Sequence, residues 1–192
     1  YDSAIYVILS NNGSYSSPIS YQCGTYPQGI SVGDINHDNY LDIIVTNNAN
    51  HSLSIFFGES NGRFSSQNVL LSGLNPWHVS LDDLNNDTHL DIIVTNSGSN
   101  TIGIYLGYGN GTFMNPKTFS TNFFPVGLSI GDLNNDGKKD LIATNAGNRT
   151  ISIFLGYGNG SFQNQISYPT GLFSWSVAIG DLNNDHDLDI IL

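Results

Sequence analysis

The 192-residue sequence predicts an all-β fold built from four tandem copies of one four-stranded unit. Three observations predict it: a strict 49-residue repeat, an abundance of the turn-forming residues Gly and Asn, and short apolar segments with strand periodicity. Charged residues make up only 11% of the chain, and no segment has the 3.6-residue periodicity of an amphipathic helix. We therefore expect many short strands joined by tight turns.

Two independent markers define the repeat. An acidic segment, D-x-N-x-D-x-x-x-D, recurs with its first aspartate at Asp34, Asp83, Asp132 and Asp181, always 49 residues apart. An Asn-Gly segment keeps the same spacing, with its glycines at Gly13, Gly62, Gly111 and Gly160. Two unrelated markers with one period indicate a true repeat and exclude low-complexity sequence.

Each unit divides into four antiparallel strands, which the second unit illustrates. Strands are predicted over residues 79–84, 90–95, 101–106 and 113–119. The second and third strands each place three apolar residues on one face: Leu90, Ile92, Val94 and Ile102, Ile104, Leu106. The Asn110-Gly111 pair predicts a type I′ turn, which needs positive φ at both central residues, before the fourth strand.

A four-stranded sheet repeated every 40 to 50 residues is typical of a β-propeller blade. A β-sandwich also has regular strands, but it does not explain a strict repeat. We expect residues 1–192 to form one propeller domain with half-blades at residues 1–29 and 177–192. Because the half-blades complement each other, we favour a closed four-bladed ring in which residues 4–9 pair beside the strand ending at Leu192. The alternative is a segment of a larger propeller, for example one with seven blades.

The acidic segments predict metal sites. Positions 1, 3 and 5 of each tight loop offer side-chain oxygens, position 7 offers a backbone carbonyl, and position 9 adds a carboxylate. Such hard oxygen donors suit Ca²⁺ better than Zn²⁺ or Mg²⁺, so up to four Ca²⁺ ions are expected. Asp and Asn also favour turns in general, yet 12 of the 16 acidic residues fall on positions 1, 5 and 9. In order of position, the predicted ligands are Asp34, Asn36, Asp38, Tyr40 and Asp42; Asp83, Asn85, Asp87, His89 and Asp91; Asp132, Asn134, Asp136, Lys138 and Asp140; and Asp181, Asn183, Asp185, Asp187 and Asp189.

These loops and the I-x-x-G-x-x-N-G-x-F segments resemble the FG-GAP and VCBS-type repeat family, which includes the head of integrin α-subunits. The resemblance spans essentially the whole chain. It implies a β-propeller, Ca²⁺ in the hairpins between strands one and two, and extracellular binding or adhesion. The family usually has Gly at loop position 6. Only Gly137 matches, so we expect the Asp132 loop to bind Ca²⁺ best and the Asp83 loop, with Thr88 there, to bind it worst.

Composition excludes several other functions. A net charge of −11 argues against nucleic acid and anionic membrane surfaces as partners, and no apolar run is long enough to insert into a membrane. The five histidines do not recur in all repeats and are interpreted as solvated loop residues. No catalytic motif or zinc-ligand spacing occurs, so the chain is not expected to be an enzyme. Cys23 has no intrachain partner for a disulfide and is expected to be a half-buried apolar residue.

The segments joining strand four to the next strand one vary most and carry aromatic residues. Variable aromatic loops on a regular scaffold are common binding surfaces, so Trp77, Phe124, Phe173 and Trp175 are candidate ligand residues. The alternative is that these rings wedge between adjacent blades. Six N-x-[ST] sequons are compatible with a glycoprotein: Asn12, Asn50, Asn86, Asn110, Asn148 and Asn159.

We therefore expect a calcium-binding extracellular module, secreted or in the ectodomain of a membrane protein, that binds a protein ligand or mediates cell adhesion. A carbohydrate-binding propeller is the first alternative, because aromatic loops and Ca²⁺ also suit sugars. A structural spacer beside a catalytic domain is the second. The protein or glycan ligand itself is not identified by the sequence.

Overall fold

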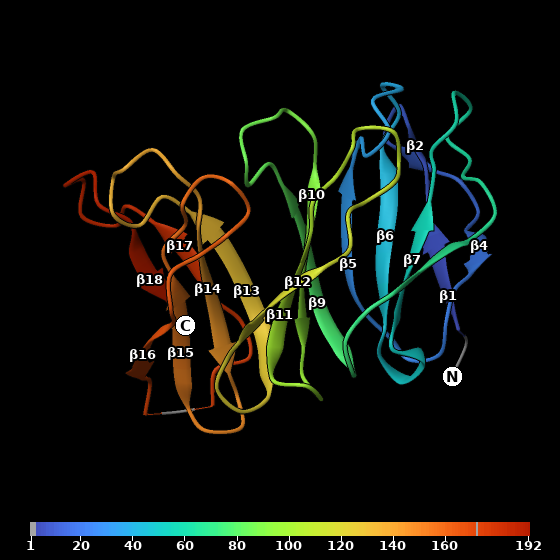
Figure 1. Cartoon of the computed structure of the whole chain (residues 1–192). Coiled ribbons are helices and arrows are strands. Elements are labelled where there is room, and N and C mark those ends of the chain that lie inside the picture. The colour runs from blue at the N-terminus through green and yellow to red at the C-terminus, as the bar shows by residue number, and fades with distance from the viewer. Residues whose placement is uncertain (1–2, 172) are drawn as a thin grey trace.

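The computed structural model describes residues 3–171 and 173–192, and it is all-β in these ranges apart from one 3₁₀ turn, η1 (Asn48–Asn50). Three complete four-stranded antiparallel sheets stand side by side between two partial ones (Figure 1). The complete sheets are β5 (Pro27–Gly33), β6 (Asp42–Asn47), β7 (Ser52–Phe56) and β8 (Asn68–Leu71); β9 (Pro76–Asp82), β10 (Asp91–Asn96), β11 (Thr101–Tyr105) and β12 (Lys117–Ser120); and β13 (Pro125–Gly131), β14 (Asp140–Asn145), β15 (Thr150–Phe154) and β16 (Ile166–Pro169).

The partial sheets are halves of the same unit. At the N-terminal end, β1 (Ala4–Val7) pairs with β4 (Ile19–Gln22), and the short strands β2 (Ser10–Asn11) and β3 (Ser14–Tyr15) form a hairpin between them. At the C-terminal end, β17 (Ala178–Gly180) pairs with β18 (Asp189–Ile191). The repeated four-stranded unit predicted from the sequence is confirmed.

In the second unit, β10 and β11 agree with the predicted strands to within one residue, whereas β9 spans Pro76–Asp82 rather than residues 79–84. The fourth strand, β12, begins at Lys117 rather than at residue 113. Phe113 instead makes an isolated bridge with Gly107, and Pro116 precedes the strand. Proline lacks the N–H that a continuous ladder would need.

The hydrophobic core lies in layers between successive sheets. Central strands β6, β10 and β14 are buried along their whole length, because one sheet covers each of their faces. In β10, Ile92 and Val94 pack toward the first complete sheet, while Ile93 packs toward the third. Each layer buries aliphatic side chains from two repeats, so a single repeat has no complete core of its own.

Buried threonines join neighbouring sheets through hydrogen bonds. Thr46 Oγ1 on β6 donates to the backbone oxygen of Trp77 at 3.0 Å, and Thr95 Oγ1 on β10 donates to that of Val126 at 3.2 Å. Both hydroxyls also accept a backbone N–H from strand one of their own sheet. These polar groups are satisfied inside the core and fix the distance between inner strands.

The Asn-Gly turns adopt two geometries. Asn12 and Gly13 have φ of 47° and 84° and join β2 to β3 as the predicted two-residue turn. The type I′ prediction is wrong at Asn110-Gly111, because positive φ occurs there at Gly109 and Gly111 but not at Asn110. The Asn110 side chain instead accepts the Thr112 N–H at 3.0 Å, which closes a longer turn.

The favoured closed ring is also wrong for this structure. β1 and β18 belong to different sheets at opposite ends of an open arc (Figure 1), so residues 4–9 do not pair beside the strand that ends at Leu192. The reason is geometric. Any stretch of four repeats has complementary ends, whereas closure depends on the angle that side-chain packing sets between successive sheets.

Cys23 is a half-buried free thiol beside the core layer formed by Ile43, Val45 and Phe56, as expected. Burial raises the pKa of its thiol, which keeps it protonated and unreactive. Within the described residues, no helix has the length and apolar character needed to cross a membrane.

Candidate metal centres in the acidic loops

The four acidic loops connect strands one and two of each unit and share one backbone conformation. Positions 4 and 6 have positive φ in every loop, between 57° and 78°. At position 6 this conformation suits Gly137 and is tolerated by Asn39, but Thr88 adopts it at φ 71° although it is β-branched. The expectation that Thr88 makes the Asp83 loop the weakest Ca²⁺ site therefore has a structural basis.

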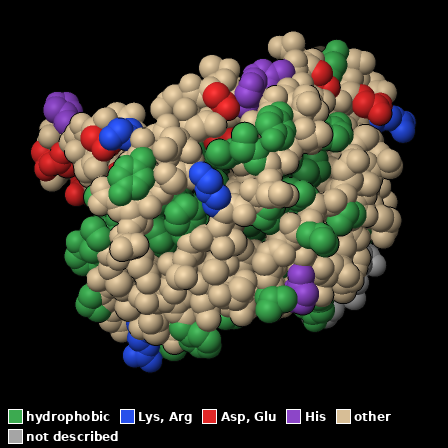
Figure 2. Space-filling model, in the orientation of Figure 1, with side chains coloured by type: hydrophobic (Ala, Val, Ile, Leu, Met, Phe, Trp, Pro, Cys, Tyr) green, Lys and Arg blue, Asp and Glu red, His purple; other side chains and the backbone are tan. Residues whose placement is uncertain are grey.

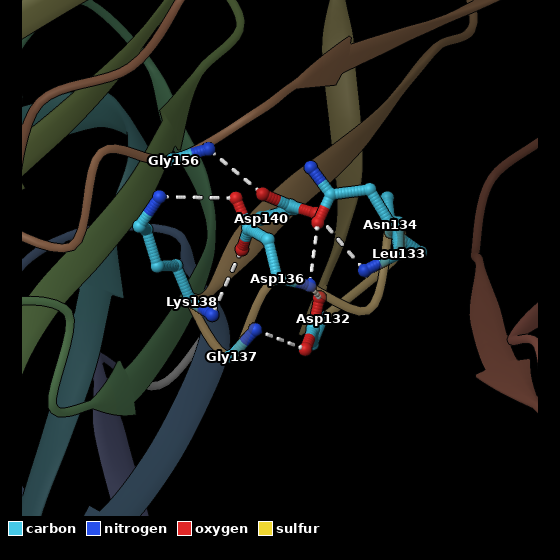
Figure 3. Close-up of polar contacts among 8 residues, drawn as sticks. All are labelled: Asp132, Leu133, Asn134, Asp136, Gly137, Lys138, Asp140 and Gly156. Carbon is cyan, nitrogen blue, oxygen red and sulfur yellow. Dashed lines mark hydrogen bonds and ion pairs between the residues drawn. The ribbon is translucent and has the colours of Figure 1, made fainter.

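Side-chain oxygens at positions 1, 3 and 5 organise each loop in the same way. In the third loop, shown in Figure 3, Asp132 accepts the N–H groups of Asp136 and Gly137 at 3.0 and 2.7 Å. Asn134 Oδ1 accepts the same Asp136 N–H at 3.1 Å, so it lies close to an Asp132 oxygen. Asp136 in turn accepts the Lys138 N–H. The equivalent bonds occur in the other three loops.

Position 9 is set apart from the others by burial. Asp42, Asp91 and Asp140 have no exposed surface, and both oxygens of each carboxylate accept backbone N–H groups. In the third unit, Asp140 accepts from Leu133 at 2.9 Å and from Gly156 at 2.7 Å (Figure 3). The carboxylate therefore joins the loop to the end of strand three. From the sequence, position 9 is predicted only as a metal ligand. The one sequence signal for its structural role is the constant spacing between position 9 and the glycine at the end of strand three, here Gly156.

That glycine, in the I-x-x-G segment, is required by a close backbone contact. A Cβ on Gly107 would lie 2.3 Å from the carbonyl oxygen of Leu90, and the equivalent contacts at Gly58 and Gly156 are 2.3 and 2.1 Å. The absence of a side chain lets strand three approach position 8 of the acidic loop, where its N–H reaches the buried carboxylate.

Carboxylates at different loop positions have pKa values shifted in opposite directions. Burial raises the pKa of Asp91 to about 6, with a smaller contribution from the charges of Asp87 and Asp83, against two backbone hydrogen bonds that lower it. Burial likewise raises the pKa of Asp42. At the exposed position 5, hydrogen bonds from the Asp187 N–H and the Asn183 amide lower the pKa of Asp185.

The donor chemistry of the loops fits a hard cation. Three side-chain oxygens per loop come from two carboxylates and one amide, and a carboxylate that accepts one N–H per oxygen retains further lone pairs. In the described ranges, no group of three or more His, Cys, Asp or Glu side chains is placed to hold a metal ion. The loops are closed by hydrogen bonds to their own backbone.

The third loop differs from the others at position 5. Lys138 Nζ lies 3.1 Å from Asp136 Oδ2. In the other loops the equivalent oxygen accepts the amide of the position 3 asparagine, and position 7 carries no lysine. Lys138 thus places a positive charge at the Asp132 loop, which is expected to bind Ca²⁺ best because Gly137 stands at position 6.

The predicted aromatic ligand residues lie at the opposite end of the sheets, where the strand four-to-one segments contact the turns between strands two and three. Trp77, Phe124 and Trp175 come from three successive units and form one cluster. Trp77 lies 5.7 Å from Phe124 and 5.8 Å from Trp175 between ring centroids. Trp175 remains 55% exposed. Phe173 does not join the cluster and stacks under the Arg149 guanidinium at 4.5 Å.

The profile of the FG-GAP-like repeat family matches three overlapping pairs of units, over residues 34–94, 83–143 and 132–192. The chain therefore belongs to the FG-GAP-like repeat family, as the sequence motifs indicated. No curated protein sequence matches it.

Several solved structures share the fold. A chain of a complex between BBS1N and ARL6DN is 14% identical, with a TM-score of 0.58 over 91% of this chain and 48% of its own. An Agrocybe aegerita lectin, described as recognising non-reducing terminal N-acetylglucosamine, is 21% identical, with a TM-score of 0.54 over 83% and 44%. A Photorhabdus luminescens Tc holotoxin pore is 16% identical, with a TM-score of 0.50 over 98% and 10%. The chain thus spans from a tenth to about half of these proteins, and the likeness defines a repeated, propeller-like architecture.

Proposed function

We propose that this chain is a calcium-stabilised binding module that acts outside the cell. The observation that carries the proposal is that the same oxygen-bearing residues, at positions 1, 3 and 5, organise all four loops through the same backbone hydrogen bonds. Residues at positions 1, 3, 5 and 9 would hold each ion, together with the carbonyl at position 7. Bound Ca²⁺ would supply positive charge to loops that concentrate 12 carboxylates, and four ions would reduce the net charge from −11 to −3.

Thermal unfolding tests the metal proposal directly. An ion that binds only the folded loops stabilises the protein by mass action. We expect the melting temperature to rise with added Ca²⁺, to rise less with Mg²⁺ at the same concentration, and to fall when EDTA is added. A melting temperature that EDTA and Ca²⁺ leave unchanged would reject calcium binding.

The proposed extracellular location is supported by the resemblance to adhesion propellers and by the sequons. All six sequon asparagines are solvent-exposed, so none is excluded by burial from carrying a glycan. Asn86 is the least favourable, because it lies inside an acidic loop at φ 59°. Expression in a secreting eukaryotic host, followed by peptide mapping before and after deglycosylation, tests this part of the proposal.

For the ligand, we propose that binding occurs at the aromatic end and involves a protein partner, as in adhesion modules. A glycan is the second candidate, favoured by the cluster of Trp77, Phe124 and Trp175, because aromatic faces pack against sugar rings. The Agrocybe aegerita lectin shares the fold at too low an identity to decide between them. A glycan array with the parent chain and Trp175→Ala separates the two: binding lost in the variant favours a sugar, and no binding by either favours a protein.

A further inference from the structure

Successive acidic loops touch through one pair of positions that recurs along the chain. Position 4 of one loop faces position 7 of the next, 52 residues further on. At the last junction, Asn135 Nδ2 donates to Asp187 Oδ1 at 2.6 Å. At the middle junction, Asn86 and Lys138 both lie against Gly158. At the first junction both positions are histidine: His37 and His89.

The two imidazoles point their nitrogens at each other. His89 Nδ1 lies 3.1 Å from His37 Nε2, the ring centroids are 4.9 Å apart, and the ring planes meet at 81°. The His89 ring packs against Gly109, where a Cβ would lie 2.3 Å from Nδ1, so that glycine makes room for it. His37 is exposed, and the pair is open to solvent. Figure 2 shows histidine beside acidic side chains along this edge of the molecule.

This geometry suits a bridging metal ion. Two nitrogens that each bind Zn²⁺ at about 2.0–2.1 Å in a tetrahedral shell lie about 3.3–3.4 Å apart, only a few tenths of an ångström more than the present separation. One ring donates its N–H to the other in the metal-free pair. When a cation replaces that proton, the donor ring carries its proton on its second nitrogen, so both facing nitrogens offer a lone pair.

We propose that His37 and His89 form a binding site for a borderline divalent transition-metal cation of the Zn²⁺, Cu²⁺ or Ni²⁺ class. Water completes the coordination shell, and the ion links the first acidic loop to the second. The donor atoms differ from those of the proposed calcium sites: His89 would offer Ca²⁺ its backbone carbonyl but offers this ion its ring nitrogen, and imidazole nitrogen favours such metals and is a poor ligand for Ca²⁺. The site is unique to this junction, because neither other pair offers two imidazoles.

Calorimetric titration of the full chain with ZnCl₂ in excess Ca²⁺ tests the proposal, since Ca²⁺ competes for the carboxylates and leaves the imidazoles free. The repeats themselves provide the variants. His37→Asn introduces the residue found at Asn86, Asn135 and Asn184, and His89→Lys introduces the residue at Lys138, which packs against Gly158 as His89 packs against Gly109. His186→Asn is the matched control, because it removes a loop histidine from outside the pair.

We expect the parent chain to bind one Zn²⁺ ion at this site, each pair variant to lose at least about ten-fold in affinity, and the control to change less than about two-fold. Electron paramagnetic resonance of bound Cu²⁺ gives a second readout, since two imidazoles produce nitrogen hyperfine splitting that carboxylates do not. Parent-like zinc affinity in His37→Asn and His89→Lys, or the absence of zinc binding by the parent chain, would overturn the proposal. Far-UV circular dichroism and the urea midpoint verify that the variants are folded.

Discussion

Position 6 of the acidic loops requires a left-handed backbone conformation, and the residues at this position in the four loops differ in how well they adopt it. Gly137 adopts it without a Cβ, whereas Thr88 holds a β-branched side chain at φ 71°. A bulky residue in this region costs on the order of 1–3 kcal/mol, supported only by the surrounding hydrogen bonds. In this loop those bonds include the Thr88 N–H to Asp83 at 2.8 Å.

Replacing Thr88 with Asn relieves this strain, because Asn39 already occupies position 6 of the first loop at φ 68°. We expect Thr88→Asn to raise the free energy of unfolding by about 1 kcal/mol in metal-free buffer, measured by urea denaturation. The reverse change at the equivalent site, Gly137→Thr, is expected to lower it. A Thr88→Asn variant less stable than the parent would contradict the strain argument.

Asp91 is expected to titrate far from an ordinary aspartate in the metal-free protein. Burial raises its folded pKa to about 6, so the folded state holds a proton that the unfolded chain has released. Its contribution to stability is therefore present below about pH 4 and is lost as the pH rises through about 6. Carboxyl carbon NMR in EDTA measures the titration of Asp91 itself, apart from the opposing effect of His78, whose pKa burial lowers. An Asp91 midpoint near 4 would refute the assignment.

At the scale of elements, the sequence predicted the strands because the repeat aligns four copies of each apolar pattern. It missed the boundary of β12, where Phe113 leaves the ladder, and the geometry of the Asn110-Gly111 turn. The strand boundary follows from Pro116, which has no N–H for the ladder, whereas the turn geometry depends on a contact between elements. The residue preceding that turn, Gly107, is held by a hydrogen bond from its N–H to the buried Asp91 carboxylate. No local pattern of residues reveals such a tether.

The close contact between strand three and the acidic loop predicts that a side chain at Gly107 is destabilising. In Gly107→Ala, the new methyl group would lie 2.3 Å from the Leu90 carbonyl oxygen, so the strand has to move away from the loop. We expect a loss of about 1–3 kcal/mol in the free energy of unfolding, typical of overpacking, together with weaker Ca²⁺ binding to the Asp83 loop. Gly180→Ala is the control, because no atom lies within 4 Å of its added Cβ. Equal stability of the two variants would show that the contact is unimportant.

At the scale of the whole molecule, the repeat predicts which residues each sheet presents to the next but not the angle between sheets. Curvature depends on how side chains from two repeats fit together in each core layer, and the phase of the chain ends carries no information about that fit. The same limit applies to contacts between loops. The pairing of His37 with His89 depends on how adjacent sheets align, so the sequence identifies both residues but not their contact.

The open arc leaves apolar strand faces uncovered, and the face on β5 leads to a prediction for the isolated 192-residue chain. Ile30 and Val32 on β5 are 56% and 51% exposed, whereas the residues equivalent to Ile30, Val79 and Leu128, are buried by the preceding sheet. A flat apolar strand face without a partner promotes association. We expect sedimentation velocity to show concentration-dependent self-association of the parent chain, and the double variant Ile30→Thr, Val32→Thr to remain monomeric with its β structure intact. Val79→Thr is the matched control: it should reduce stability, because it places a hydroxyl in the core, without reducing association. A parent chain that stays monomeric at high concentration would show that this face does not drive assembly.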